Sequence, residues 1–253
     1  AVADKFKREN NLYYTPEQVL VSPGAKYSLY LAIMAMIDPG DEVIVPTPAW
    51  VSYPPMVELA GGVPVLMPTF EKNAFSFGAA ELRAVITPRT KAIILNSPSN
   101  PTGGIVPEKD LKAIAAVCEE KGLWVISDEI YEHLIYGADK HVSIASLSDS
   151  LLSHRGVSNG VSKADAMTGW RIGFAAGPKD VISAMANIQS QSTSNACSIA
   201  QAASIAALNG SQECVETMRK AFEKRRDLIV KELNAIPGVR CLSPQGAFYA
   251  FPN

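Results

Sequence analysis

Residues 108–128 read EKDLKAIAAVCEEKGLWVISD and contain a helix pattern followed at once by a strand pattern. Four apolar residues of the first part share one helix face, because they stand at i, i+3, i+4 and i+7: Leu111, Ile114, Ala115 and Cys118. Gly122 then supplies the residue type that most often ends a helix. Residues 123–127 are mostly apolar and lead into Asp128. The stretch therefore predicts a helix over Glu108–Lys121 and a buried strand that ends on a carboxylate.

The same alternation of strand and helix patterns extends in both directions from this stretch. Short apolar or β-branched runs indicate further strands at residues 19–22, 43–45, 63–67, 92–95, 156–159 and 172–176. Helical patterns at residues 25–37 and 56–60 end at an Asp-Pro-Gly turn and a Gly-Gly turn. Strands separated by helices predict an α/β fold with a largely parallel central sheet and helices on both faces.

The carboxyl ends of the strands are where an open sheet of this kind binds its ligands. Three residues with a suitable polar or backbone group follow the predicted strands: Gly24, Asn100 and Asp128. These are the first candidate site residues.

The last quarter of the sequence has a different character. A long helical pattern covers residues 212–233, and its apolar face is formed by Val215, Met218, Phe222 and Ile229. Two strand-like runs follow at residues 239–241 and 247–251. We therefore predict a large domain over residues 1–210 and the beginning of an incomplete small α+β domain over residues 211–253.

The composition excludes several classes of protein. The 253 residues carry a formal net charge of −2, which does not favour nucleic acid or an anionic membrane as a partner. No apolar run has the length of a membrane span. The four cysteines form no CxxC pair and do not stand near a histidine at metal-ligand spacing, as is typical of reduced thiols. We expect a metal-free protein of the cytoplasm.

Residues 160–173, GVSKADAMTGWRIG, carry the clearest chemical signal. Lys163 stands among small residues in a predicted turn after a strand, where its amine is able to reach a ring-shaped cofactor. Arg171 stands just before an apolar strand, where a guanidinium suits a fixed dianion such as a phosphate. The spacing alone is equally compatible with structural roles for both residues.

Four segments together resemble the class I and II aminotransferases, which use pyridoxal 5′-phosphate (PLP). Residues 160–173 are similar to the cofactor-attachment signature of that family. Residues 97–103 (SPSNPTG) resemble its Asn-Pro-Thr-Gly loop, and residues 127–132 (SDEIYE) resemble its strand-end Asp-Glu-x-Tyr motif. Residues 46–54 (PTPAWVSYP) resemble the aromatic loop that covers the cofactor ring. The nearest group is the bacterial aspartate aminotransferase-like enzymes, and the implied fold is the large domain of fold type I PLP enzymes.

The resemblance implies catalytic roles for Lys163, Asp128 and Tyr131. Lys163 would hold PLP as a Schiff base and, once released, would move a proton at the substrate Cα. Asp128 would keep the pyridine nitrogen protonated, so that the ring withdraws electrons. Tyr131 and Asn100 would hydrogen-bond the ring oxygen O3′, and the Asn-Pro bond after Asn100 would be cis. Trp50 would stack on the ring, and Trp50 and Asn100 would also contact the substrate.

The resemblance also implies a cradle for the cofactor phosphate. Gly24, Ala25 and Lys26 open a predicted helix directly after a strand, so that backbone N–H groups and the positive end of the helix dipole point at the site. Arg171 adds a guanidinium, and Ser162 adds a hydroxyl.

Three positions depart from the family pattern. Gly160 stands where many relatives have a serine, which leaves part of the phosphate cradle in question. Asp165 stands where relatives have an aromatic or small residue, and we expect it to point to solvent rather than toward the reactive lysine. Ala196 replaces a usual proline after Ser194 and Asn195, a pair that resembles a loop reaching the phosphate of the neighbouring subunit.

The leading interpretation is transfer of an amino group from an L-amino acid, by default aspartate, to a 2-oxo acid, by default 2-oxoglutarate, in a ping-pong cycle. The alternatives are another fold type I PLP enzyme, such as a lyase, synthase or decarboxylase, and a non-catalytic PLP-binding module. The resemblance implies a homodimer without nucleic acid or membrane partners. Family members extend beyond both ends of this sequence, and the later part supplies an arginine for the substrate α-carboxylate. We therefore expect the chain alone to bind PLP but to transaminate poorly.

Overall fold

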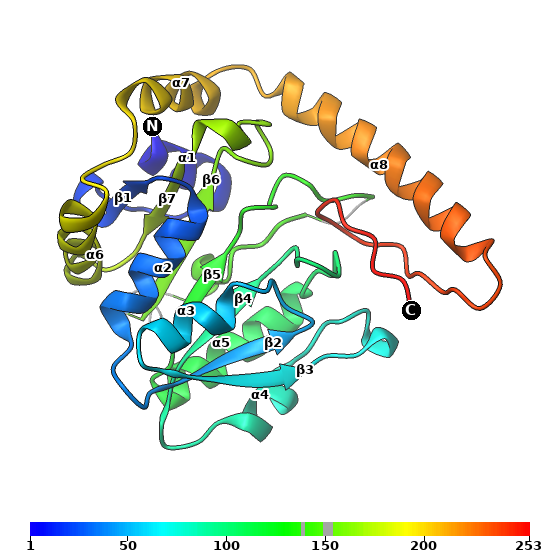
Figure 1. The fold of residues 1–253 in the computed structure, drawn as a ribbon, viewed down its shortest axis with the longest axis horizontal. Helices are drawn as coiled ribbons and strands as arrows, with labels where there is room; N and C mark the ends of the chain where they lie inside the picture. Colours follow the sequence, from blue (N-terminus) through cyan, green and yellow to red (C-terminus); the bar gives the residue numbers. More distant parts are fainter. Residues whose placement is uncertain (138–139, 149–153) are drawn as a thin grey trace.

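The computed structural model describes residues 1–137, 140–148 and 154–253. Within these residues the centre is a seven-stranded sheet covered by helices, and a long helix extends away from it toward the C-terminus (Figure 1). The predicted α/β fold is confirmed. Among the described residues, no helix combines the length and the apolar character that crossing a membrane requires.

Most of the predicted elements are present, with ends that differ by a few residues. The strands are β1 Val19–Ser22, β2 Glu42–Thr47, β3 Val63–Pro68, β4 Thr90–Asn96, β5 Trp124–Asp128, β6 Arg155–Gly160 and β7 Gly173–Ala176. The helices are α1 Val2–Asn10, α2 Ala25–Met36, α3 Tyr53–Leu59, α4 Ala79–Val85, α5 Glu108–Lys121, α6 Lys179–Ser192, α7 Ser198–Asn209 and α8 Glu213–Asn234. Short 3₁₀ turns are η1 Pro16–Gln18, η2 Glu71–Asn73, η3 Ile144–Ser146 and η5 Thr168–Trp170.

The sheet has the strand order β1-β7-β6-β5-β4-β2-β3. Strands β2 to β6 pair in parallel, whereas β7 is antiparallel to both of its neighbours, β1 and β6. The prediction of a largely parallel sheet is therefore confirmed. Because β4, β5 and β6 run in parallel, their carboxyl ends lie together: Asn96 is in register with Asp128, and Asp128 is in register with Ser158.

Alternate residues of each strand point to opposite sides of the sheet, and helices pack on both faces. One face packs against α2, α3 and α6 through strand residues Val43, Val45, Ala92, Ile94 and Ile126. The other face packs against α4 and α5 through strand residues Ile44, Ile93, Leu95 and Val125. A third apolar cluster lies beside β1 and β7 and includes Phe6 of α1, Phe174 of β7 and Ala200 of α7.

Helix α5 agrees with its sequence pattern in detail. Its four predicted face residues are all buried, with exposures of 3% or less: Leu111, Ile114, Ala115 and Cys118. Gly122 follows the helix with φ of 65°, a left-handed conformation that glycine adopts without strain.

The two strands predicted near the C-terminus are wrong. Of residues 239–241 only Cys241 forms a bridge, with Pro252, and residues 247–251 form none; the nearest bridge to the second run joins Gly246 to Ile135. Ala247 has φ of 58°, which is incompatible with extended backbone, and Pro252 has no N–H to donate to a ladder. The apolar face of α8 is buried only near its start: Val215 is 6% exposed, whereas Ile229 is 46% exposed.

Candidate active site

A pocket with about 680 Å³ of space, part of it open to solvent, lies at the carboxyl edge of the sheet. Nine of the ten residues that the sequence analysis assigned to the site line it: Ala25, Lys26, Trp50, Asn100, Asp128, Tyr131, Ser162, Lys163 and Arg171. The tenth, Gly24, lies directly against Arg171. The fold thus brings together residues from the beginning, middle and later part of the chain.

Lys163 follows β6 in a turn, and its side chain is half-buried. Its amine lies 5.8 Å from the centre of the Tyr131 ring and 5.3 Å from the centre of the Phe248 ring. Burial, followed by the charge of Arg171, lowers the pKa of the Lys163 amine, and the charge of Asp128 opposes this in part. The lowered pKa favours the neutral amine, which is the nucleophilic form.

Asp128 ends β5 and is only 4% exposed. Its Oδ1 accepts the Ile130 backbone N–H at 3.2 Å, and its Oδ2 accepts the Tyr53 hydroxyl at 2.7 Å. Burial raises the pKa of Asp128 to about 6, while the hydrogen bond from Tyr53 acts in the opposite direction. A nearby positive charge would therefore stabilise the ionised form of this buried carboxylate.

Asn100 and Tyr131 meet at a third polar residue, Tyr249. The Tyr131 and Tyr249 hydroxyls lie 2.5 Å apart, and Asn100 Nδ2 donates to the Tyr249 hydroxyl at 3.2 Å. Asn96 fixes this side of the pocket, since its Oδ1 accepts the Asn100 backbone N–H at 2.8 Å and its Nδ2 donates to the Asp128 carbonyl at 3.0 Å. The Asn100–Pro101 peptide bond is cis, as predicted, and the Thr47–Pro48 and Ser97–Pro98 bonds are cis as well.

The start of α2 and the side chain of Arg171 form a cradle of donors. Gly24 precedes α2 with φ of 97°, and a Cβ added to it would lie 2.3 Å from Arg171 Nη2. Only glycine therefore lets the guanidinium lie against the first turn of the helix. Arg171 Nη1 donates to the Thr168 carbonyl at 3.0 Å. The side-chain hydroxyl of Thr168 in turn donates to the Ser162 carbonyl at 2.9 Å.

Trp50 precedes α3 and lines the pocket. Its ring packs edge-to-face against Tyr53, with ring centres 5.3 Å apart. The Lys26 amine lies 4.7 Å from the centre of the Trp50 ring, which is a cation–π distance.

The departures at Gly160 and Asp165 have physical explanations. A Cβ on Gly160 would lie 2.8 Å from the Ile172 carbonyl oxygen and 3.0 Å from Gly173 Cα, so this backbone leaves no room for a serine.

Asp165 was expected to point to solvent, but it is half-buried. Burial raises its pKa, and the charges that act on it are those of His133, Glu9 and Lys5 rather than that of Lys163.

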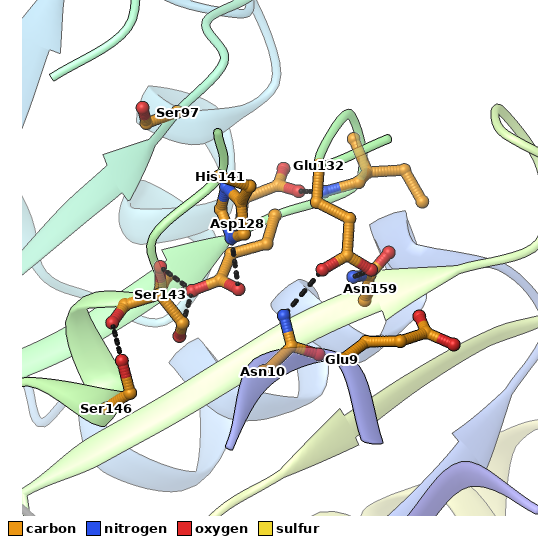
Figure 2. Close-up of polar contacts among 12 residues, drawn as sticks. Glu9, Asn10, Ser97, Asp128, Glu132, His141, Ser143, Ser146 and Asn159 are labelled. Atoms are coloured by element: carbon orange, nitrogen blue, oxygen red, sulfur yellow. Dashed lines mark hydrogen bonds and ion pairs between the residues drawn. The ribbon is translucent and has the colours of Figure 1, made fainter. Parts of the chain in front are cut away.

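A second polar cluster supports the segment that carries Asp128 and Tyr131. Figure 2 shows Asn10 of α1 and Asn159 of β6 pointing at Glu132, and both amides donate to its carboxylate at 2.6 Å. The buried amine of Lys5 forms an ion pair with Glu132 as well. The side chain of Glu129 accepts three hydrogen bonds, from Ser127, Ser143 and His141.

Two groups in this cluster have the residue types of a metal site, namely Glu9, Glu132 and His133, and Glu129, Glu132 and His141. Glu132 belongs to both groups and is already compensated by the charge of Lys5. The arrangement is explained by ion pairing, and the sequence-based expectation of a metal-free protein stays a prediction.

Ser194 and Asn195 lie apart from the pocket. Both are exposed in the connection between α6 and α7, and neither lines the pocket. Their predicted contact with a second subunit stays a prediction.

Four polar residues of the pocket were given no role from the sequence: Tyr53, Asn96, Thr168 and Tyr249. Asn96 stands at the end of a predicted strand, so the strand-end rule that pointed to Asp128 applies to it equally. Tyr249 had no such signal, because it reaches the pocket from a loop at the far end of the chain.

Known proteins are similar to this chain over its full length. The family model "Aminotransferase class I and II" matches residues 1–253. An aspartate aminotransferase from Geobacillus stearothermophilus is 56% identical over 252 residues, which are 100% of this chain and 64% of that protein. An aspartate/prephenate aminotransferase from Cereibacter sphaeroides is 51% identical over 254 residues, again 100% of this chain and 64% of the relative.

Solved structures give the same result. The crystal structure of the aspartate aminotransferase from Rhizobium meliloti has a TM-score of 0.97 and 46% identity, and covers 100% of this chain and 63% of that one. An aromatic aminotransferase from Pyrococcus horikoshii has a TM-score of 0.96 and 42% identity, with 99% and 68% covered. The chain thus spans about 64% of the length of the curated relatives it matches. On this match over its full length, the chain belongs to the class I and II aminotransferase family.

Proposed function

We propose that the protein transfers an amino group from an L-amino acid, with aspartate as the default donor, to a 2-oxo acid, with 2-oxoglutarate as the default acceptor. The two halves of the reaction would follow one another in a ping-pong cycle. The observation that carries the proposal is that the amine of Lys163, the carboxylate of Asp128 and the guanidinium of Arg171 line one pocket. The names of the relatives, aspartate and aspartate/prephenate aminotransferases, support the choice of donor.

The residues of the pocket fit PLP as the cofactor. Arg171 and the first turn of α2 offer charged and backbone donors for a phosphate, and Gly24 leaves the space for this arrangement. Asp128 is a buried carboxylate with a raised pKa, which suits a protonated ring nitrogen as a partner. When bound, PLP supplies an electron-withdrawing ring that stabilises negative charge on the substrate carbon next to the nitrogen.

Lys163 has the two properties that its role requires. Its lowered pKa increases the fraction of neutral amine, which is the form in which Nζ is able to bond the cofactor covalently. Once free of that bond, the same amine would move a proton between the substrate Cα and the cofactor carbon C4′.

The remaining residues bind and orient. Asp128 holds a proton on the ring nitrogen, and the hydroxyl of Tyr131 and the amide of Asn100 donate to the ring oxygen. The Trp50 ring limits tilting of the cofactor and, with Asn100, contacts the substrate. Arg171, Ser162 and the backbone at Gly24, Ala25 and Lys26 bind the phosphate.

The test begins with the covalent bond. PLP is added to the purified protein, the bond is reduced with borohydride, and the labelled peptide is identified by mass spectrometry. We expect the label on Lys163 and its loss in Lys163→Ala, whereas Lys112→Ala, which removes a lysine exposed on α5, keeps it. A folded protein that binds no PLP covalently would contradict the site assignment.

The reaction is tested on the loaded protein. Because the chain alone is expected to transaminate poorly, we expect aspartate to convert the cofactor to its amine form slowly, and 2-oxoglutarate to convert it back, with glutamate as the product. A lyase, synthase or decarboxylase would instead release its product without accumulating the amine form. A non-catalytic module would keep the bond to Lys163 when amino acids are added. Aromatic donors and prephenate are the competitors to test, because they occur in the names of the relatives.

Three further expectations belong to this proposal. The large domain is assigned to residues 1–210 and the start of the small domain to residues 211–253, at the loop before α8. The protein would act in the cytoplasm. It would form a homodimer, which the molecular mass in solution tests directly.

A further inference from the structure

Tyr53 contacts Asp128 directly, although the resemblance to the family assigned it no role. It is the first residue of α3, is 3% exposed and donates its hydroxyl to Asp128 Oδ2 at 2.7 Å. Burial raises the pKa of Tyr53 well above its usual value, and the Asp128 charge adds to this, so the hydroxyl stays protonated and remains the donor.

The hydrogen bond determines the orientation of the carboxylate. The Ile130 backbone N–H binds Oδ1 at 3.2 Å while Tyr53 binds Oδ2, so rotation of the carboxylate plane would break both bonds. A bond from a neutral donor to a charged acceptor is among the stronger hydrogen bonds in proteins.

Few other groups influence the charge of Asp128. Glu129, its neighbour in sequence, disfavours the negative charge, and the Lys163 amine across the pocket favours it. Tyr131, which also lines the pocket, is neutral because burial and its hydrogen bond with Tyr249 raise its pKa. Among the described residues, Tyr53 is thus the side chain that donates a hydrogen bond to the Asp128 carboxylate.

The ring of Tyr53 has a second contact of consequence. It packs edge-to-face against Trp50, the residue expected to cover the cofactor ring, with ring centres 5.3 Å apart. One side chain therefore contacts both the group expected at the ring nitrogen and the group expected at the ring face.

We infer that Tyr53 is a positioning residue of the active site, which orients the Asp128 carboxylate and stabilises its charged form while it supports the Trp50 ring. The inference rests on the proposed PLP site. It concerns this chain's own residues, so part of its test needs no cofactor.

The first arm of the test uses the protein without cofactor. The Asp128 carboxyl is titrated by ¹³C NMR in the wild type and in Tyr53→Phe. Loss of a hydrogen bond to a charged group is expected to raise the pKa of Asp128 by about one to two pH units. Tyr14→Phe is the matched control, because Tyr14 is a buried tyrosine that packs against Phe6 outside the pocket, and it is expected to leave the titration unchanged.

The second arm measures the dissociation constant of PLP. Tyr53→Phe is expected to weaken binding by about tenfold or more, and the loss is expected to disappear when Asp128 is replaced as well, in Asp128→Asn. A merely structural role of Tyr53 would give the same loss in both backgrounds. If Tyr53→Phe does not fold, 3-fluorotyrosine at position 53 replaces it: the more acidic hydroxyl is expected to lower the pKa of Asp128.

The outcomes separate the two proposals. If the wild type fails to bind PLP, the proposed function is wrong, and the NMR arm still decides the role of Tyr53. If the wild type binds PLP but the Asp128 titration and the dissociation constant are unchanged in Tyr53→Phe, the inference about Tyr53 is wrong.

Discussion

At the scale of single residues, two opposing effects act on the charged form of Asp128: burial disfavours it, and hydrogen bonds favour it. Its position at the carboxyl end of β5 places it in the pocket, and the helices on both sides of the sheet bury it. Burial alone disfavours the charged carboxylate, and the hydrogen bonds from Tyr53 and Ile130 recover only part of this loss. A protein without a cofactor therefore carries a destabilising charge at neutral pH.

This gives a prediction for the stability of the cofactor-free protein. The pKa of Asp128 is raised from 3.8 to about 6, so its contribution to stability is fully present below pH 3.8 and is lost as the pH rises through 6. The loss amounts to about 3 kcal/mol at pH 8. We expect Asp128→Asn to be more stable than the wild type by up to this amount at pH 8, and by only about 0.5 kcal/mol at pH 4.

Urea unfolding at pH 4, 6 and 8 measures the difference. Asp38→Asn, at an exposed position after α2, serves as the control and is expected to follow the wild type at each pH. Equal stability of Asp128→Asn and the wild type at pH 8 would show that Asp128 is not destabilised by its burial.

At the scale of elements, helix α1 is joined to the strand-end segment by a buried ion pair. Lys5 is 2% exposed and pairs with Glu132, which also accepts from Asn10 of the same helix. Burial would raise the pKa of Glu132, but the charges of Lys5 and of two histidines, His133 and His141, outweigh it and lower the pKa to about 2. Because Glu132 adjoins Tyr131, α1 contributes indirectly to the shape of the pocket.

We therefore expect Lys5→Met to destabilise the protein by about 3–5 kcal/mol at pH 7, because it leaves the buried Glu132 carboxylate without its compensating charge. Urea unfolding measures the effect. Lys7→Met, which changes an exposed lysine on the same helix, is the control. The double variant Lys5→Met with Glu132→Gln is expected to recover part of the loss. A loss no larger than that of Lys7→Met would mean that the ion pair does not stabilise the fold.

At the scale of the whole molecule, the pocket depends on a contact across the chain. Residues 245–247 are held between two loops: Gln245 and Gly246 donate backbone N–H groups to the Gly103 carbonyl, and the Ala247 N–H bonds the Leu134 carbonyl at 2.8 Å. This places the Tyr249 hydroxyl 2.5 Å from that of Tyr131.

Tyr249→Phe removes the hydroxyl and keeps the ring. We expect it to weaken PLP binding about fivefold, corresponding to about 1 kcal/mol, because the Tyr131 hydroxyl loses its partner. Fluorescence titration with PLP measures the change, and Tyr13→Phe, at a position 69% exposed, is the control. An unchanged dissociation constant would show that Tyr131 does not need Tyr249 for its orientation.

Predictions that rest on residues close together in the sequence agree with the structure better than predictions that depend on distant residues. The α5 helix, its glycine stop and the strand that ends on Asp128 were predictable, since their patterns depend on residues a few positions apart. The absence of strands at residues 239–241 and 247–251 was not predictable. An apolar run becomes a strand only beside a partner strand, and the left-handed Ala247 interrupts the second run. Asp165 shows the same limit: it lies toward His133 and Glu9, which a local pattern does not indicate.

Three results were predictable from the sequence alone: the α/β class, the grouping of candidate site residues, and the family to which they point. The grouped residues are Lys163, Asp128, Asn100, Tyr131 and Arg171. These results follow from short motifs and periodicities, which are local properties of the chain. Three contacts are seen only in the folded protein: Tyr53 donates to Asp128, the Tyr249 hydroxyl contacts that of Tyr131, and Lys5 pairs with Glu132. The last two contacts join residues 118 and 127 positions apart, and packing of the whole chain, rather than any local preference, brings them within hydrogen-bonding distance.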